Sequence, residues 1–167
     1  HCLRNPAGGM SVHRLFLDLK AQGHAVSKDS VHALLGHLVD AYLLQAVPLH
    51  TASERQRNSN PRKIYPADPG LIHAFDASGR ANTGRALETT VFNELQRRLA
   101  EAAYVKTAEG FEVDFLASYR DGRCELLQVC ADPSTLDARE RELRGLADAA
   151  KSAKGRDERE KRERQES

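Results

Sequence analysis

The sequence predicts an α+β protein built from two parts. Residues 10–70 contain two amphipathic helix patterns and two short apolar strands separated by a polar, basic loop. Residues 84–150 contain a longer helix, three strand patterns and a last helix. An Asp-Gly pair between the last two strands is a strong hairpin signal. Residues 71–83 are expected to link the two parts.

The first part begins after residues 1–9, which are expected to form a loop or a severed connection. From Met10 to Gln22, apolar residues recur at helical spacing until Gly23 stops the run. Ser27 is a suitable N-cap for a second helix. The apolar face of that helix would consist of Val31, Leu34, Leu35, Leu38 and Val39.

Two strands are expected next, at Tyr42–Leu49 and at Lys63–Tyr65, with the turn-rich stretch Thr51–Pro61 between them. Helix, turn, helix, strand, basic loop and strand is the order of a winged helix-turn-helix segment. Two of the usual three helices are visible.

The second part starts with the clearest helix pattern of the chain, from about Gly84 to Ala100. Its apolar positions are Leu87, Val91, Phe92, Leu95 and Leu99. Strands are expected at Ala103–Thr107, Phe111–Ser118 and Cys124–Ala131, and a helix from Ser134 or Thr135 to Ala150. This is the αβββα order of restriction-endonuclease-like folds, the PD-(D/E)XK nuclease superfamily.

Composition excludes several classes of protein. The net charge of +1 gives no overall attraction to nucleic acid, so binding would need local clusters. Cys2, Cys124 and Cys130 lack the spacing of a zinc site or a disulfide framework, which favours a cytoplasmic protein. No window is apolar enough to span a membrane, and no phosphate-binding G-x-x-x-x-G-K-[ST] loop is present. The tail 151–167 is highly charged and is expected to be disordered or a solvated helix.

Four positions are candidates for a nuclease-like site. Alternate residues of a strand face the same way, so Glu112 and Asp114 share a face, whereas Val113 and Phe115 are expected to point into the core. On the next strand the positions for a second acid and a lysine hold Gln128 and Cys130. Glu88 aligns with the apolar face of its helix and is expected to point inward.

Glu88 and Asp114 are the candidate ligands for Mg²⁺, and both also have a structural interpretation. An inward Glu88 could pair with an arginine or cap a loop, and a single strand aspartate is more often structural than catalytic. Mg²⁺ prefers several oxygen ligands. Two carboxylates with an amide are a poor set, so the site is expected to be vestigial and the chain to be non-catalytic and without a cofactor of its own.

A second candidate site is the basic loop, where four basic residues lie near one acid. Such a cluster suits contacts with phosphates, although a solvated surface loop is the alternative. Two residues on the second helix would join it. The candidate nucleic-acid-binding residues are Lys28, His32, Arg55, Arg57, Arg62 and Lys63.

Several blocks of the sequence resemble a known family. They are Lys63–Leu71 (KIYPADPGL), Gly84–Leu95 (GRALETTVFNEL), Gly110–Phe115 (GFEVDF) and Leu127–Cys130 (LQVC), with Asp132–Thr135 (DPST) and Arg141–Leu143 (REL) after them. In this order they resemble the C-terminal domain of unknown function of prokaryotic AAA-type ATP-binding proteins. The resemblance covers about residues 10–150.

The resemblance implies an N-terminal P-loop ATPase domain, followed by a winged helix and a nuclease-like domain. ATP would bind only to that N-terminal domain, which is the expected partner of this chain. Some members carry I-E-V-K where this chain has L-Q-V-C, which argues against cleavage. Three functions are therefore expected in order: a binding and regulatory module that contacts DNA through the wing, a metal-dependent nuclease with a degenerate site, or an oligomerisation domain.

Overall fold

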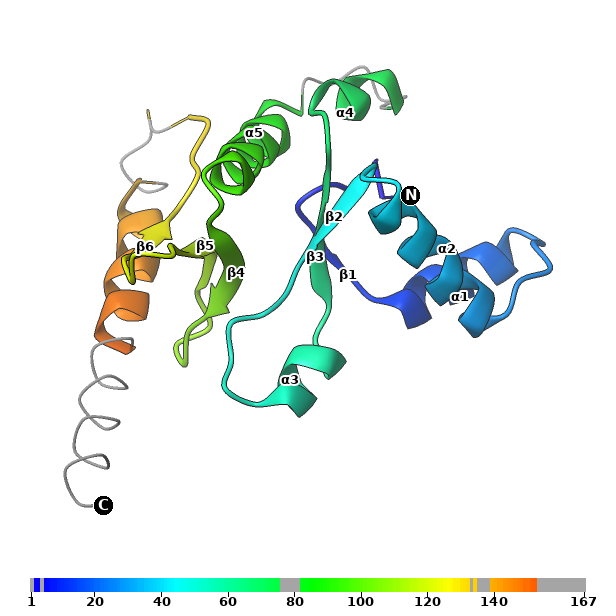
Figure 1. The fold of residues 1–167 in the computed structure, drawn as a ribbon, viewed down its shortest axis with the longest axis horizontal. Helices are drawn as coiled ribbons and strands as arrows, with labels where there is room; N and C mark the ends of the chain where they lie inside the picture. The colour runs from blue at the N-terminus through cyan, green and yellow to red at the C-terminus, as the bar shows by residue number, and fades with distance from the viewer. Residues whose placement is uncertain (1, 4, 76–81, 133, 135–138, 153–167) are drawn as a thin grey trace.

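The computed structural model describes residues 2–3, 5–75, 82–132, 134 and 139–152. It contains helices and two small antiparallel sheets of three strands each, which confirms the α+β class (Figure 1). Within these residues no helix is both long and apolar enough to cross a membrane. The expected linker residues 76–81, the expected helix start at 135–138 and most of the tail, 153–167, lie outside the described residues.

The first sheet and its helices occupy the N-terminal part of the chain. The sheet has the strand order β1-β3-β2, with both pairs antiparallel. The elements are β1 (Gly9–Met10), α1 (Val12–Ala21), α2 (Lys28–Asp40), β2 (Leu44–Val47), α3 (Glu54–Ser59) and β3 (Arg62–Pro66).

Helix starts in this part follow from serine side chains. The hydroxyls of Ser11, Ser27 and Ser53 accept hydrogen bonds from backbone N–H groups at the starts of α1, α2 and α3. The expected cap at Ser27 is therefore confirmed.

Two expectations for this part are wrong. Residues 1–9 are not only a loop, because Gly9 pairs with Lys63 in the sheet and the Ala7 N–H donates to the Ile64 carbonyl at 2.8 Å. The stretch Thr51–Pro61 is not irregular throughout, because Ser53 starts the short helix α3 within it.

The second sheet has the order β4-β5-β6, again antiparallel. The elements are α4 (Gly70–Phe75), α5 (Thr83–Arg97), β4 (Glu101–Lys106), β5 (Glu112–Ser118), β6 (Cys124–Leu127) and a helix over residues 139–152. The Asp-Gly hairpin is confirmed: Ser118 pairs with Cys124, and Gly122 takes the positive φ of 85° that the turn requires. β6 ends at Leu127, so Gln128 and Cys130 follow the strand instead of lying within it.

A bulge in β5 overturns the expected alternation of faces. Ala103 pairs with Leu116, and Val105 pairs with Val113, so Tyr104 alone lies opposite both Asp114 and Phe115. Phe115 therefore packs with Tyr65 and Phe92 on one side of the sheet, whereas Val113 packs with Ala149 on the other. Phe115 and Asp114 thus face the same side, contrary to the strict two-residue period.

The two sheets are joined through the end of β2. The His50 N–H donates to the Tyr104 carbonyl at 2.8 Å, and the Tyr104 N–H donates to the Pro48 carbonyl at 3.0 Å. Three rings then fill the space between β3, α5 and β5, with Tyr65 and Phe92 centroids 4.7 Å apart and Phe92 and Phe115 centroids 5.9 Å apart. In this shared core, side chains of β3 and β5 meet, with the Tyr65 and Phe115 ring centroids 5.5 Å apart.

Parts of the expected helix faces are exposed. On α5, Phe92 and Leu95 are buried, but Leu87 is 39% exposed and Leu99 is 63% exposed beyond the helix end. On α2 only Val31 is fully buried, and Leu34, Leu38 and Val39 are exposed. The expected all-apolar faces of both helices are therefore only partly covered within the described chain.

Candidate functional site

The side chain of Lys63 lies at the centre of a cluster of three carboxylates. Its Nζ is 2.9 Å from Asp114 Oδ1, 3.0 Å from Glu112 Oε1 and 3.2 Å from Glu88 Oε1. Lys63 is 3% exposed, so this ammonium group is removed from solvent. We call these four residues the Lys63 cluster.

Three separate elements position the Lys63 cluster. Lys63 comes from β3, Glu88 from α5, and Glu112 and Asp114 from β5. Glu88 points inward as expected, and its Oε1 also accepts a hydrogen bond of 2.6 Å from the Tyr65 hydroxyl. Tyr65 lies two residues after Lys63 on β3, so both side chains reach the same face of that strand.

Asp114 is held by contacts on both carboxylate oxygens. Oδ1 accepts from Lys63, and Oδ2 accepts from the Val129 N–H at 3.0 Å. The Asp114 N–H donates to Gln128 Oε1 at 3.2 Å. Gln128 therefore contacts the backbone of Asp114 and not its carboxylate. Cys130 is a partly buried free thiol beyond β6.

The electrostatics of the Lys63 cluster follow from burial and close opposite charges. Burial would lower the pKa of Lys63, but Glu88, Asp114 and Glu112 together raise it above its usual value. Burial raises the pKa of Glu88, and the nearby Asp114 raises it further, although Lys63 acts in the opposite direction. Burial and the Glu88 carboxylate likewise raise the pKa of Tyr65. One lysine among three acids leaves a surplus of negative charge, which protonation of Glu88 would relieve.

The carboxylates of the Lys63 cluster surround an ammonium group in this structure. In the described part of the chain, no group of three or more His, Cys, Asp or Glu side chains is placed to hold a metal ion. Glu88 Oε1 and Asp114 Oδ1 both accept hydrogen bonds from the ammonium group of Lys63. The two carboxylates that were the candidate Mg²⁺ ligands, Glu88 and Asp114, thus contact a lysine instead.

The expected nucleic-acid-binding set divides into three groups. Lys63 is buried and is wrong as a phosphate contact, because its ammonium group faces the carboxylates. Lys28, His32 and Arg62 line one hollow of about 570 Å³ between α1, α2 and β3. Arg55 and Arg57 are exposed on α3, where an Arg57 guanidinium N–H donates to the Thr51 carbonyl at 3.1 Å.

The sequence pointed to Glu88 and Asp114 as site residues. It placed Lys63 in the nucleic-acid-binding set and gave no role to Tyr65. A signal for both was present in the strand Lys63-Ile64-Tyr65. Lys63 shares a strand face with the aromatic Tyr65, and a face that carries a large ring is more often buried than solvated.

The chain is similar to an uncharacterized protein of Methanocaldococcus jannaschii. The two sequences are 32% identical over 149 residues, which cover 87% of this chain. The same match covers 32% of the relative, so this chain spans about a third of that protein's length. No family model matches the chain, and no solved structure matches it significantly.

Proposed function

We propose that this chain is a non-catalytic binding and regulatory module from the C-terminal part of a AAA-type ATPase. Its partner would be the N-terminal ATPase domain of the same protein, in the cytoplasm. The order of elements supports a winged-helix segment followed by a nuclease-like αβββα unit. The resemblance of the sequence blocks and the match to about a third of a longer archaeal protein are consistent with this proposal.

The observation that carries the proposal is the position of Lys63. A nuclease of this superfamily needs its acids free to bind a metal ion, but here the acids hold a buried lysine from another sheet. The Lys63 cluster thereby connects β3 to α5 and β5. A nuclease-like platform whose acids are engaged by a lysine, and which carries the basic residues of α3 and β3, is suited to binding and not to cleavage.

Cleavage and binding are tested separately. Linear and supercoiled DNA are incubated with Mg²⁺ or Mn²⁺ and either the wild-type chain or Asp114→Asn. We expect no metal-dependent products that differ between the two proteins. Products made by the wild type and lost in Asp114→Asn would overturn the non-catalytic assignment.

That outcome would favour the second candidate function, a degenerate metal-dependent nuclease. The observation in its favour is that Glu88, Asp114 and a lysine do meet, as acids and a lysine do in active PD-(D/E)XK enzymes. Lys63 would then replace the lysine that the position of Cys130 lacks. Lys63→Met would abolish cleavage in this case, and circular dichroism of the same variant shows whether the loss comes from the chemistry or from unfolding.

DNA binding is measured by fluorescence anisotropy of a labelled duplex over a range of salt concentrations. In B-DNA each phosphate contact contributes about 0.9 to the slope of log K against log salt, so Arg55, Arg57 and Arg62→Ala together should reduce the slope by about 2 to 3. The matched control replaces Arg139, Arg141 and Arg144, three exposed arginines of the C-terminal helix. Equal losses in both triple variants would indicate a net-charge effect and would contradict binding through the α3–β3 region.

A further inference from the structure

A hollow of about 570 Å³ separates α2 from the sheet β1-β3-β2. Its volume falls within the range of ligand sites in proteins. Figure 1 shows α1 and α2 on one side of this sheet and the second sheet on the other. We call this space the α2–sheet hollow.

The sheet wall of the hollow is one face of three paired strands. Met10 lies opposite Arg62, and Ala46 lies opposite Ile64. Residues that lie opposite each other, and alternate residues of one strand, direct their side chains to the same face. These four residues all line the α2–sheet hollow, whereas Lys63 faces its carboxylates on the other side of β3.

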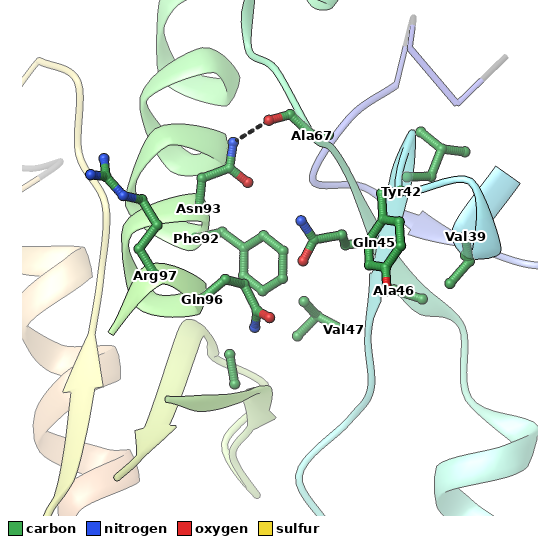
Figure 2. Close-up of a pocket in the computed structure, with 12 residues that line it drawn as sticks. Val39, Tyr42, Gln45, Ala46, Val47, Ala67, Phe92, Asn93, Gln96 and Arg97 are labelled. Atoms are coloured by element: carbon green, nitrogen blue, oxygen red, sulfur yellow. Dashed lines mark hydrogen bonds between the residues drawn. The ribbon is translucent and has the colours of Figure 1, made fainter. Parts of the chain in front are cut away.

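The alternation of faces on β2 can be followed in Figure 2. Ala46 lies on the side of Val39 of α2, and Val47 lies on the side of Phe92 of α5. Val47 belongs to the core that the two sheets share. Arg62, which has the same facing as Ala46, therefore directs its side chain toward α2 and away from that core.

The helix wall of the hollow is a single stripe of α2. Lys28, His32, Leu35 and Val39 all line the hollow. At 100° per residue these four positions lie within about 60° of one another around the helix. The Lys28 and His32 side chains therefore project on the same side of α2 as the apolar residues Leu35 and Val39.

Gly36 lies beside this stripe and also lines the hollow. It is the ninth residue of the 13-residue helix α2, and glycine inside a helix costs about 0.5–1 kcal/mol relative to alanine. A Cβ at Gly36 would meet no atom within 4 Å, so close packing does not require a glycine here. The missing side chain instead leaves the hollow open.

Positive charge lies at one end of the hollow. Within the described chain, the side chains of Lys28 and Arg62 have neither an ion pair nor a hydrogen bond. Asp40 is the one acid that lines the hollow, and it follows Lys28 by twelve residues, about 18 Å along the helix. Asp40 lies where α2 leads into β2 at Leu44, and Arg62 is at the far end of β3 from Pro66, the partner of Leu44. The end that carries Lys28 and Arg62 therefore favours an anion.

The rest of the lining is largely aliphatic. Leu35, Val39, Leu44 and Ile64 lie between the basic end and the α2–β2 junction. None of the described residues that line the hollow is a Phe or a Tyr, so the rings that commonly stack on bases are missing from this wall. An aliphatic chain suits such a surface because its contacts are apolar and need no ring.

We propose that the α2–sheet hollow binds an amphipathic anion, an aliphatic chain that ends in a carboxylate or a phosphate. The head group contacts Lys28 and Arg62, and the chain lies between the apolar stripe of α2 and the sheet. From His32 to Val39 the stripe is about 10 Å long, which suits a chain of medium length. The proposal goes beyond DNA binding and does not depend on it, although Lys28 and Arg62 also belong to the candidate nucleic-acid-binding set.

Isothermal titration calorimetry of the whole chain, without DNA and below the micelle concentration of each probe, tests the proposal. The probes are decanoate, decyl phosphate, decanol and inorganic phosphate. We expect one saturable site for decanoate or decyl phosphate, and the tighter of the two identifies the head group. Decanol lacks the charge and should bind about tenfold more weakly. No saturation by either anion, or equal affinity for decanol, would overturn the proposal.

A charge variant tests the head-group contact. Lys28→Gln combined with Arg62→Gln should weaken binding of the anionic probe at least tenfold and leave decanol binding unchanged. The matched control is Arg14→Gln with Lys20→Gln, which removes the same charge from exposed positions of α1 outside the hollow. Equal losses in both double variants would indicate a net-charge effect and would contradict the proposed site.

Gly36→Leu tests the place of the chain by filling the hollow. Leucine favours a helix more than glycine does, so thermal unfolding should show no loss of stability while probe binding falls at least tenfold. Ala33→Leu is the control, since Ala33 is exposed on α2 and does not line the hollow. Unchanged binding to Gly36→Leu would place the probe on the exposed leucines of α2 and would overturn the proposal. If Gly36→Leu lowers the melting temperature, the charge variant decides.

Discussion

Lys63 Nζ lies 2.9 Å from Asp114 Oδ1, although the two residues are 51 positions apart and belong to different sheets. Both side chains are nearly buried, at 4% and 11% exposure. The contact therefore joins the sheet β1-β3-β2 to the sheet β4-β5-β6 inside their shared core. Such pairs are sensitive to the loss of one partner, because the remaining charge stays buried.

Lys63→Met should strongly destabilise the chain. Methionine fills much of the same volume but leaves Glu88 and Asp114 without their cation. Removing one partner from a buried ion pair typically costs about 3–5 kcal/mol. Urea unfolding followed by circular dichroism measures the change. Lys106→Met is the control: Lys106 is 51% exposed and 3.9 Å from Glu112, so we expect a change within about 0.5 kcal/mol. Similar losses in both variants would contradict a special role for Lys63.

Glu88→Gln should change how stability depends on pH. The pKa of Glu88 in the folded chain is raised above its ordinary value of 4.5, so the folded state binds this proton more tightly than the unfolded state. The stabilisation from that proton is complete below pH 4.5 and is lost as the pH rises through the folded pKa. Glutamine cannot titrate, so the variant should gain stability relative to wild type as the pH rises from about 4 to 8.

The control for this measurement is Glu94→Gln. The hydrogen bond from Arg98 holds the pKa of Glu94 below its usual value, so Glu94 contributes stability that is lost as the pH falls. The difference between Glu94→Gln and wild type should therefore have the opposite sign of slope. Urea unfolding at each pH gives the free energy of unfolding of each variant relative to wild type. If this difference stays constant or falls with rising pH for Glu88→Gln, the pKa of Glu88 is not raised.

Local patterns were sufficient to predict most elements. The Asp-Gly pair located the β5–β6 hairpin, Ser27 located the start of α2, and the long apolar pattern located α5. The inward direction of Glu88 also followed from its place on that helix. Each of these depends on neighbours within a few residues, which the sequence displays directly.

The position of Lys63 could not be predicted in the same way. It depends on the pairing of Pro48 and His50 with Tyr104, which joins the two sheets and lets the Lys63 side chain reach Asp114. No local pattern encodes that pairing, so Lys63 was counted among the basic residues of a loop. The bulge at Asp114 and Phe115 has the same origin: the strand reads as a regular alternation, and only the register with β4 shows the extra residue.

Leu99→Gly should stabilise the chain. Leu99 follows the end of α5 with a φ of 57°, and its N–H donates to the Gln96 carbonyl while the Ala100 N–H donates to the Leu95 carbonyl. These two bonds form a helix-ending motif whose left-handed position favours glycine. Leu99 is 63% exposed and loses little packing, so we expect a gain of about 1 kcal/mol. Gly23, which ends α1 with a φ of 85°, is the reciprocal control.

The reciprocal substitution Gly23→Ala should destabilise the chain by about 1 kcal/mol. A Cβ at Gly23 meets no atom within 4 Å, so the cost would come from the backbone and not from a clash. Thermal unfolding of both variants gives the comparison. If Leu99→Gly lowers the melting temperature, then packing of the Leu99 side chain outweighs the backbone strain.

Two double-mutant cycles should rank the Asp114 and Glu112 carboxylates of the Lys63 cluster by their coupling to Lys63. Asp114→Asn and Glu112→Gln are each made alone and together with Lys63→Met, and the free energy of unfolding is measured for every single and double variant. Coupling between residues in direct contact reaches about 0.5–3 kcal/mol. Asp114 is 11% exposed, so its coupling to Lys63 should lie near the upper end. The Glu112 side chain is 43% exposed and screened by water, so its coupling should stay below about 1 kcal/mol despite a similar distance of 3.0 Å. Equal coupling energies for the two acids would mean that distance alone, and not burial, determines the strength of these ion pairs.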